Sequence, residues 1–258
     1  MFRPRSAVLL ALVTGLLLAP SAAFAAAEVH RFSLALSAAP TSILAGDFND
    51  GLDFYNRTVI TAPPRGYEPL DKVGFSWLFD SEFRYFLTRN FAVSTGFGQV
   101  RARSVKEYLP ALTQSINVRA ELISVPVHLG AAYYLQPYNQ GDFQARMFFG
   151  GGVVQYTHSR SSFEQLLVAA DSLTNFQLGG SRKITSSSDA TGYYGEGGVH
   201  MFFASRYSVL LSVLYRSGEV QGLVDERTGQ PILNPKTGRP AGLDVGGVGL
   251  RMAAVIGL

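Results

Sequence analysis

The sequence predicts an all-β fold, namely an eight-stranded antiparallel up-and-down transmembrane β-barrel with short turns at one end and long loops at the other. Three observations lead to this prediction. Only 16% of the 258 residues are charged, whereas an average soluble domain carries about 25%. Eight segments alternate apolar and polar residues. The links between these segments alternate between short and long, as in strands that run up and down through a bilayer.

The first 25 residues have the order of a secretory signal peptide. Arg3 and Arg5 precede an apolar run, and an Ala-Phe-Ala motif stands at residues 23–25. The run is shorter than the ~20 residues that a membrane-spanning helix needs. We therefore expect residues 1–25 to be removed on export and residues 26–258 to form one barrel domain.

The remaining chain alternates with period two. In residues 70–87, Trp77 and Phe83 stand at odd positions, and Asp80 and Glu82 at even ones. Because successive side chains of a strand point to opposite faces, one face is apolar and the other polar. A bilayer crossing takes ~9–11 tilted strand residues. The expected strands are residues 31–39, 70–87, 91–98, 123–135, 143–150, 193–203, 207–216 and 247–258.

The links place both termini at the end with short turns. The short links are residues 88–90, 136–142 and 204–206, and the long ones are residues 40–68, 104–118, 159–190 and 217–242. A ten-stranded wall stays open as an alternative, if the first or the third long loop adds a hairpin.

Three of the long loops carry local signals. In the third, Ser161 and Glu164 form a capping-box pattern, and apolar residues from Phe163 to Ala170 follow at helical spacing, which predicts two or three helical turns. In the first, residues 46–53 resemble a calcium loop, but Thr58 stands where a bidentate Glu is required, so we expect turns. Residues 225–240 predict a small exposed hairpin.

Period two alone does not separate a membrane barrel from a soluble one, because the two differ in which face is apolar. Strand charges facing small residues favour the membrane barrel, since large beside small fills a narrow lumen. Counting back from the short turns places Glu82 opposite Gly96, Asp80 opposite Gly98, His128 opposite Gly150 and Arg146 opposite Ala132. Aromatic residues at the short-turn ends predict an interfacial girdle of Phe83, Tyr85, Phe91, Tyr133, Phe143, Phe203 and Tyr207.

The chain resembles the small eight-stranded outer-membrane barrels of the OmpA/OmpX kind. The resemblance rests on the strand–turn phrase at residues 83–93, on residues 122–129, on two glycine-rich runs at residues 150–153 and 197–200, and on an apolar C-terminal strand. Such proteins usually end in Phe, whereas this chain ends in Leu258. The resemblance implies the outer membrane of a Gram-negative cell as location. It also implies the barrel-assembly machinery, outer-membrane lipid and lipopolysaccharide as partners.

The predicted lumen is charged and nearly balanced, which favours a network of ion pairs that plugs it. Glu196 and Arg216 are expected to lie diagonally on neighbouring strands, within reach of each other. A narrow path for solutes or ions is the alternative, if a few charges swing aside. The inward charged positions are Asp80, Glu82, Arg84, His128, Arg146, Glu196, His200, Arg216 and Arg251.

A lipid A-modifying hydrolase or acyltransferase is the second alternative. Asp80, His128 and Ser124 are residue types of a hydrolytic triad, but geometry decides such a site. The run from His158 to Ser161, with Glu164, lies near the long-loop rim, where some small outer-membrane enzymes place His, Ser and an acid. No family signature accompanies either set.

We therefore expect a monomeric structural or surface-binding barrel that is not an enzyme and that acts through its long loops. The sequence predicts no catalytic residues, cofactor or metal site. The chain has no Cys and no Lys/Arg cluster of the kind that tracks phosphates, so nucleic acid is not an expected partner.

Overall fold

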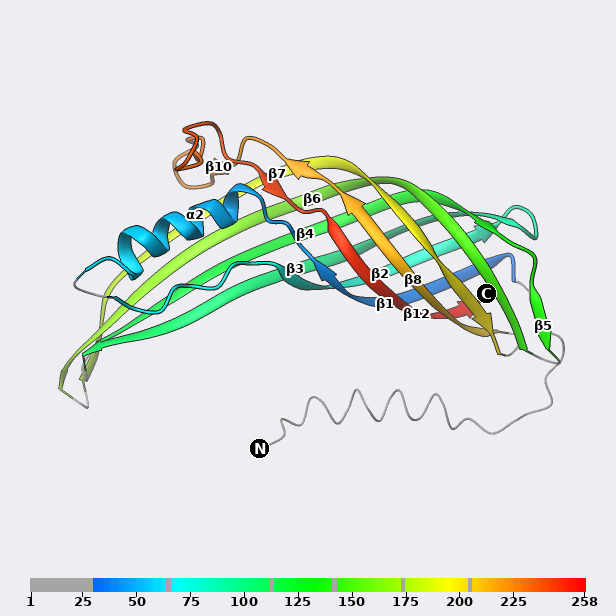
Figure 1. Cartoon of the computed structure of the whole chain (residues 1–258), viewed down its shortest axis with the longest axis horizontal. Coiled ribbons are helices and arrows are strands. Elements are labelled where there is room, and N and C mark those ends of the chain that lie inside the picture. Colours follow the sequence, from blue (N-terminus) through cyan, green and yellow to red (C-terminus); the bar gives the residue numbers. More distant parts are fainter. Residues whose placement is uncertain (1–29, 64–65, 112–113, 141–142, 173–174, 204–205) are drawn as a thin grey trace.

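Eight strands form a closed antiparallel ring (Figure 1). The computed structural model describes residues 30–63, 66–111, 114–140, 143–172, 175–203 and 206–258; the predicted signal peptide lies outside them. Each strand pairs with the next, and the last returns to the first, which confirms the predicted up-and-down barrel. The ring strands are β1 (Phe32–Ser42), β2 (Phe75–Phe86), β3 (Phe91–Ala111), β4 (Gln114–Tyr134), β6 (Phe143–Ser172), β7 (Asn175–Phe202), β8 (Tyr207–Ser217) and β12 (Gly247–Gly257).

Four short strands accompany the ring without widening it. β5 (Tyr138–Gln140) pairs with β6, and β10 (Val224–Asp225) pairs with β7. β9 (Glu219–Val220) pairs with β11 (Leu243–Asp244) in a separate small sheet. Within the described residues no loop inserts a hairpin between ring strands, so the count is eight and not ten.

Over the ring, the outer face of the wall is apolar, and the charged side chains of the ring strands point inward. On β2, Phe79 is 59% exposed, whereas Glu82 is 1% exposed. On β12, Met252 is 54% exposed beside the buried Arg251. A barrel in water would show the reverse, with its large apolar residues inside. The sidedness is the one that the sequence predicts for a bilayer-spanning wall.

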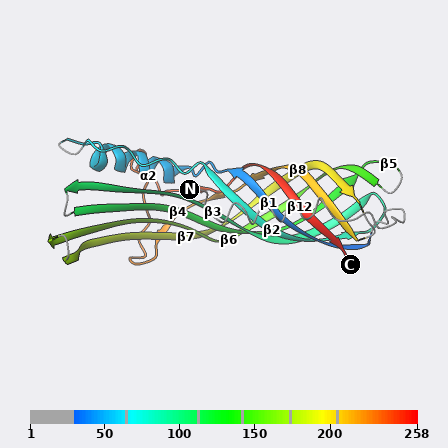
Figure 2. The ribbon, with the colours of Figure 1, turned by 90° about the horizontal axis from the view of Figure 1, so that it is seen from below.

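Four strands continue far beyond the ring at the end opposite the short turns (Figure 2). β3 and β4 have 21 residues each, β6 has 30 and β7 has 28, whereas β1, β8 and β12 have 11. We call the projecting parts of β3, β4, β6 and β7 the extension. The expected loops at residues 104–118 and 159–190 are therefore wrong: both are mostly strand. Each is a hairpin that keeps its hydrogen-bonded pairing after it leaves the ring.

The predicted helix at residues 161–170 is also wrong, because this segment belongs to β6. It is paired on both sides, with Phe163 opposite Ala120 of β4 and Ile184 of β7. Two ladders of backbone hydrogen bonds outweigh a local helical pattern, since propensity is a weak preference that tertiary context overrides. The Phe163 ring meets Tyr55 edge to face, 4.7 Å between centroids.

The helix lies instead in the first long loop, where turns are expected from the sequence. α2 (Asp47–Tyr55) continues into a π-helical turn, η1 (Asn56–Ile60). Asp47 and Asp50 stand in its first turn, where negative charge is favoured by the helix dipole. Leu52 is buried against the extension. The spacing of Phe48, Leu52 and Tyr55 is the helical signal in the sequence that the intervening Gly51 and acidic residues obscure.

Two asparagines attach this helical segment to the chain that returns to β2. The Asn49 side chain accepts from the Val73 N–H at 2.9 Å and donates to the Val73 carbonyl at 3.0 Å. Asn56 brackets Leu70 in the same way, at 2.8 and 2.9 Å. Each amide thus replaces both hydrogen bonds that a strand neighbour would have supplied.

The fourth long loop contains the hairpin expected at residues 225–240, as two consecutive turns. The first closes through the Asp225 N–H, which donates to the Gln230 carbonyl, and the second through the Asn234 N–H, which donates to the Arg239 carbonyl. Gly229 and Gly238 both have φ of 69°, which explains the glycine in each Thr-Gly pair.

The register across the first short turn is confirmed, and that across the second is wrong. Glu82 lies opposite Gly96 and Asp80 opposite Gly98, as predicted. His128 lies opposite Val154 instead of Gly150. The reason is β5, which continues the pairing with β6 as far as Gln140 opposite Phe143, so the chain reverses nearer to β6 than the middle of the link. Counting from the middle of the link therefore fails.

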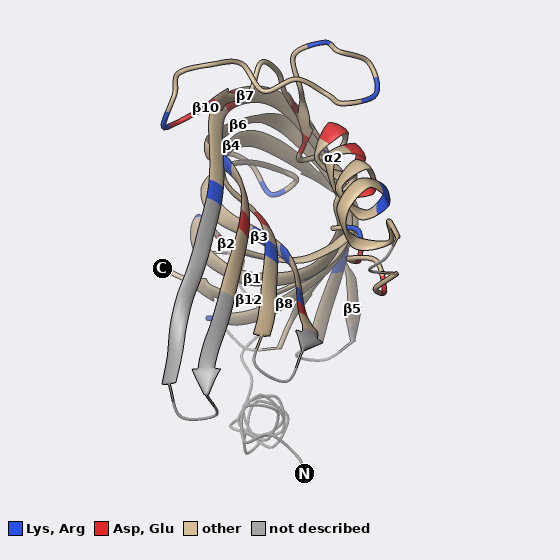
Figure 3. Ribbon diagram, turned by 90° about the vertical axis from the view of Figure 1, so that its left-hand side faces the viewer, with Lys and Arg blue, Asp and Glu red and all other residues tan. Residues whose placement is uncertain are grey.

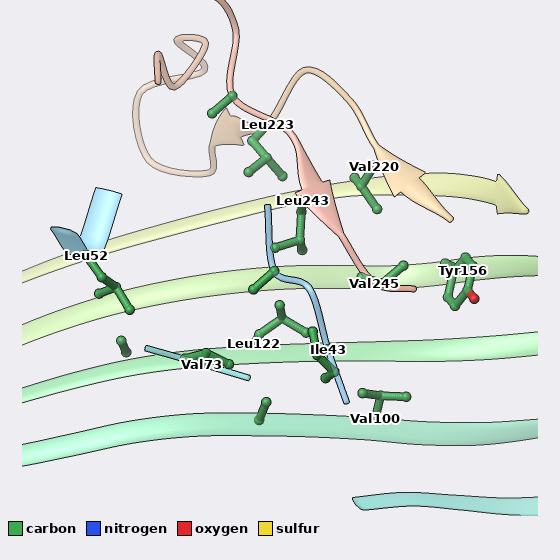
Figure 4. Close-up of a cluster of buried hydrophobic side chains, with 14 of the residues drawn as sticks. Ile43, Leu52, Val73, Val100, Leu122, Tyr156, Val220, Leu223, Leu243 and Val245 are labelled. Carbon is green, nitrogen blue, oxygen red and sulfur yellow. The ribbon is translucent and has the colours of Figure 1, made fainter. Parts of the chain in front are cut away.

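The interior is layered, and it is not polar throughout as expected. Near the short-turn end lies a small apolar cluster that includes Phe86, Tyr134 and Phe148. The charged side chains form the next layer. Beyond them a larger apolar cluster fills the far half of the ring and the base of the extension, where Val100, Leu122 and Tyr156 of the wall meet loop residues such as Ile43 and Leu243 (Figure 4).

Candidate functional site: the barrel interior

Arg251 is the centre of the charged layer. It projects inward from β12 and its guanidinium contacts three carboxylates: Asp80 at 2.8 Å, Glu82 at 2.9 Å and Glu196 at 3.1 Å. Its Nε also donates to the Ser37 hydroxyl at 3.0 Å. Arg251 and the three carboxylates are all buried. Their ion pairs join β12 to β2 and β7 through the lumen, although these three strands are not neighbours of one another in sequence.

Arg84 supplies the second buried cation. It lies 2.5 Å from Glu82 and 4.0 Å from Glu196, and it also donates to the Tyr134 hydroxyl. The guanidinium lies 5.4 Å from the centre of the Phe148 ring, within the range of a cation–π contact. Glu82 is thus shared between two arginines, which offsets part of the large cost of burying its charge.

His128 completes this cluster from β4. Its ring nitrogens lie 3.7 Å from Asp80 and 3.6 Å from Glu82. One ligand atom from each of the three side chains falls within 4.8 Å of the others, a spacing that a metal ion would need. The same two carboxylates are already bonded by Arg251, however. The arrangement is therefore that of an ion-pair network whose positive charge comes from the chain itself.

Two of the predicted lumen residues, Arg146 and His200, lie apart from this cluster at the short-turn end. Arg146 donates to the main-chain carbonyls of Arg89 at 2.6 Å and of Leu135 at 3.3 Å. His200 lies between the Tyr134 hydroxyl, at 3.3 Å, and the Ser208 hydroxyl, at 2.8 Å. Both residues line the short-turn end of the interior and pack against its aromatic rings.

Arg216 does not pair with Glu196, contrary to the diagonal contact expected from the sequence. Its Nη2 donates to the Thr41 hydroxyl at 3.0 Å, while Glu196 is bonded by Arg251 and by the Ser212 hydroxyl at 2.6 Å. The Nε and Nη1 of Arg216 have no protein acceptor among the described residues. They border a space of only about 30 Å³ between the charged layer and the far apolar cluster, room for a water molecule.

The predicted girdle residues lie around the short-turn end of the outer surface. Phe83, Phe91, Tyr133, Phe203 and Tyr207 are between 37% and 64% exposed. Tyr85 and Phe143 are partly covered by neighbouring rings, which are Phe32 at 4.6 Å and Phe203 at 5.5 Å between centroids.

Of the residues considered for a hydrolytic triad, Asp80 and His128 lie 3.7 Å apart, but the hydroxyl of Ser124 is bonded elsewhere. The Ser124 hydroxyl is buried and bonds the Ser159 hydroxyl at 2.8 Å, on the opposite side of the wall from the exposed His158. Ser161 is likewise turned inward and bonds Ser186 at 2.6 Å. His158 has φ of 52° at a β-bulge, and its backbone N–H donates to Asp189.

The extension is the structural feature that the sequence pattern does not predict. Its alternation is inverted relative to the ring, because Val100 and Ala102 point inward while Arg101 and Arg103 are exposed. The same inversion places Val118, Ala120 and Leu122 inside, in alternation with Arg119 and Glu121. A change in which face is apolar, read along one continuous alternating segment, is the signal that could have revealed it.

The chain matches no protein-family model and no curated protein. Solved structures similar to it include the attachment invasion locus protein Ail of Yersinia pestis, at 13% identity and TM-score 0.37, over 89% of this chain and 98% of that one. They also include the outer membrane protein OprG of Pseudomonas aeruginosa, at 14% identity and TM-score 0.44, over 90% and 97%. Neisserial surface protein A matches at 10% identity and TM-score 0.41, over 88% and 97%.

These are small outer-membrane barrels, the class that the sequence motifs resemble. At such identities the similarity leaves the function of this chain open. Among the described residues, no helix is long and apolar enough to span a membrane.

Proposed function

We propose that the chain is an outer-membrane barrel with a closed lumen, which serves as a structural or surface-binding protein through its extension. The outward belt of Phe, Leu, Val and Met around the ring suits hydrocarbon. With the short turns in the periplasm, the extension stands outside the cell. Lipid and lipopolysaccharide would surround the ring, the barrel-assembly machinery would insert it, and the ring needs no second copy to close.

The observation that carries this proposal is the filled interior. Arg251 and Arg84 bind three carboxylates that are all buried, and apolar side chains pack on both sides of this layer. The space left beside it is about 30 Å³. A path for solutes would require several ion pairs to part together, each leaving charge unpaired in a water-poor interior.

Single-channel recording in planar bilayers tests the closed lumen. We expect the wild-type protein, refolded and inserted, to leave the bilayer electrically silent at both polarities, with a large porin as the positive control. Steps of uniform size in the wild type would show a narrow channel and overturn the proposal. An Arg251→Ala variant provides the matched comparison, because it removes the residue that joins the three carboxylates.

A further inference from the structure

A second interior space lies in the extension, well separated from the charged layer. It is a cavity of about 390 Å³ between α2, the inner faces of β6 and β7, and the segment 223–241. Its size exceeds the ~150 Å³ of a dry cavity that holds benzene and falls within the ~300–1,000 Å³ of small-molecule sites. Figure 3 shows α2 alongside the strands of the barrel, with its acidic positions in red.

The walls of this cavity are mostly apolar. The helix presents Phe48, Leu52 and Tyr55, the wall presents Phe163 and Ile184, and the loop presents Leu223 and Ile232. Gly51 opens the space further, because a side chain added at this residue would meet no atom within 4 Å of its Cβ.

The polar groups on the lining are satisfied by one another. Ser161 and Ser186 share a hydrogen bond of 2.6 Å, and the Tyr55 hydroxyl donates to Gln165 at 3.1 Å. Asn234 donates to Asp47 at 2.7 Å. None of these pairs leaves a charged donor directed into the space, so a ligand would find hydroxyl and amide groups there and no cation.

The charged groups at the start of the helix offer an anionic ligand no favourable partner. Asp47 lines the cavity, and Asp50 stands one turn further along α2. A hydrogen bond from Lys236 holds the pKa of Asp50 below its ordinary value, so this carboxyl is ionised at neutral pH. Asp50 is paired with Lys236, and no Lys or Arg is among the residues that line the cavity, so an acyl carboxylate or a phosphate would meet the Asp47 carboxylate without a counter-charge there.

We infer that this cavity binds a neutral, largely apolar small molecule about as large as a fused pair of aromatic rings. Such a molecule would carry at most one hydroxyl or amide group. The inference rests on the proposed surface-binding function and names its ligand class. A ring system would displace poorly bonded water from apolar walls, which is favourable by about 25 cal/mol per Å² of apolar surface removed from water. One hydroxyl could exchange hydrogen bonds with the Ser161–Ser186 pair.

Methyl NMR tests this inference on the whole protein in phosphatidylcholine nanodiscs. The probe is 2-naphthol, which is neutral at pH 7, and the reporters are the δ1 methyl groups of isoleucine. Ile184 and Ile232 line the cavity, whereas Ile256 lies on the outer face of the ring and reports partitioning into lipid. We expect saturable shifts at Ile184 and Ile232, and only a linear, unsaturated change at Ile256.

Two variants of Gly51 provide matched controls. Gly51→Leu fills the cavity from the helix, and we expect it to weaken the saturable binding by about tenfold or more, the effect of roughly 1.4 kcal/mol. Gly51→Ala also removes the low helix propensity of glycine, but it adds only a methyl group to the cavity. Binding by this variant should therefore stay within about twofold of wild type. Unchanged methyl positions in the ring show that both variants fold.

Three results would overturn the inference: no saturable shift at Ile184 and Ile232, equal binding by Gly51→Leu, or equal binding of the anion 2-naphthoate. Each is distinct from a failure of the proposed closed lumen, which shows only in the conductance. If the bilayer stays silent and no saturable binding is seen, the proposed closed barrel is supported and the proposed ligand is rejected.

Discussion

At the scale of single residues, Arg251 is the arginine that pairs with the most carboxylates among the described residues of the interior. It neutralises carboxylates from β2 and β7 while standing on β12. Such contacts cross the lumen instead of following the wall. Burying a guanidinium is costly unless its donors are used, and here its Nε and both Nη atoms bond carboxylate or hydroxyl oxygens.

Replacing Arg251 by Met is expected to destabilise the barrel by about 3–5 kcal/mol, because it leaves buried carboxylates without their shared cation. Equilibrium unfolding by guanidinium in phospholipid vesicles measures the loss. Arg103→Met is the control, since Arg103 is exposed on the extension and should change stability by no more than about 0.5 kcal/mol. Equal effects of the two substitutions would contradict the role given to Arg251.

The sequence predicts which residues enter the lumen but not how they pair. Alternation places Glu196 and Arg216 on the inner face, and adjacent-strand counting makes them neighbours. Glu196 instead reaches Arg251, which is on a strand two places away in the ring. Curvature brings such strands together across the interior, and a one-dimensional count contains no information about curvature.

At the scale of elements, the sequence predicts strands well where the bilayer imposes one pattern and poorly beyond it. The ends of β3, β4, β6 and β7 read as loops because their charged residues suggest solvent. Arg101, Arg103 and Arg119 are on the outer face, while Ala120 and Leu122 keep the inner face apolar. Residues 163–170 satisfy a helical pattern as well, and only the partners on both sides decide in favour of a strand.

The attachment of α2 depends on its asparagines, and Asn56 is the more buried one. Asn56→Ala leaves the N–H and carbonyl of Leu70 without their partner, a loss of about 1–3 kcal/mol per unsatisfied buried group. We expect the Leu70 amide to exchange with deuterium about tenfold faster or more, as read by NMR or mass spectrometry.

Asn139→Ala is the matched control for this experiment. Asn139 is an exposed residue of β5 that accepts a bond from Gln144 at the opposite end of the barrel. It should leave exchange at Leu70 unchanged. An Asn56→Ala variant with wild-type exchange at Leu70 would show that the packing of Leu52 and the bonds of Asn49 are enough to hold the helix.

At the scale of the whole molecule, the two halves have opposite sidedness. The ring turns Leu211, Leu250 and Met252 outward, and the extension turns Val118 and Leu122 inward, where they pack in one cluster with residues of α2 and the loops. The level at which the pattern inverts is where the surroundings change from hydrocarbon to water, because each half buries or exposes what its own solvent requires.

A charge placed on either half locates that boundary. Met252→Arg introduces a cation in the middle of the outer face of β12, and we expect a loss of about 2–4 kcal/mol in vesicles. Val105→Arg, at an equally exposed position on the extension, should cost no more than about 0.5 kcal/mol. Unfolding titrations of both variants in the same lipid provide the comparison. A large loss of stability in Val105→Arg would show that the hydrocarbon region reaches Val105 on the extension.

The position of Arg251 on β12 also sets an order of events. The bond from Arg251 to Ser37 joins residues 214 apart, so it forms only when the first and last strands meet. Contacts of such separation are slow to form, since the loop between them must be ordered first. Until then Asp80 lacks its arginine, and Glu82 and Glu196 have only Arg84 as a guanidinium partner. Closure of the ring by the final strand is thus also the step that completes the ion-pair network of the interior.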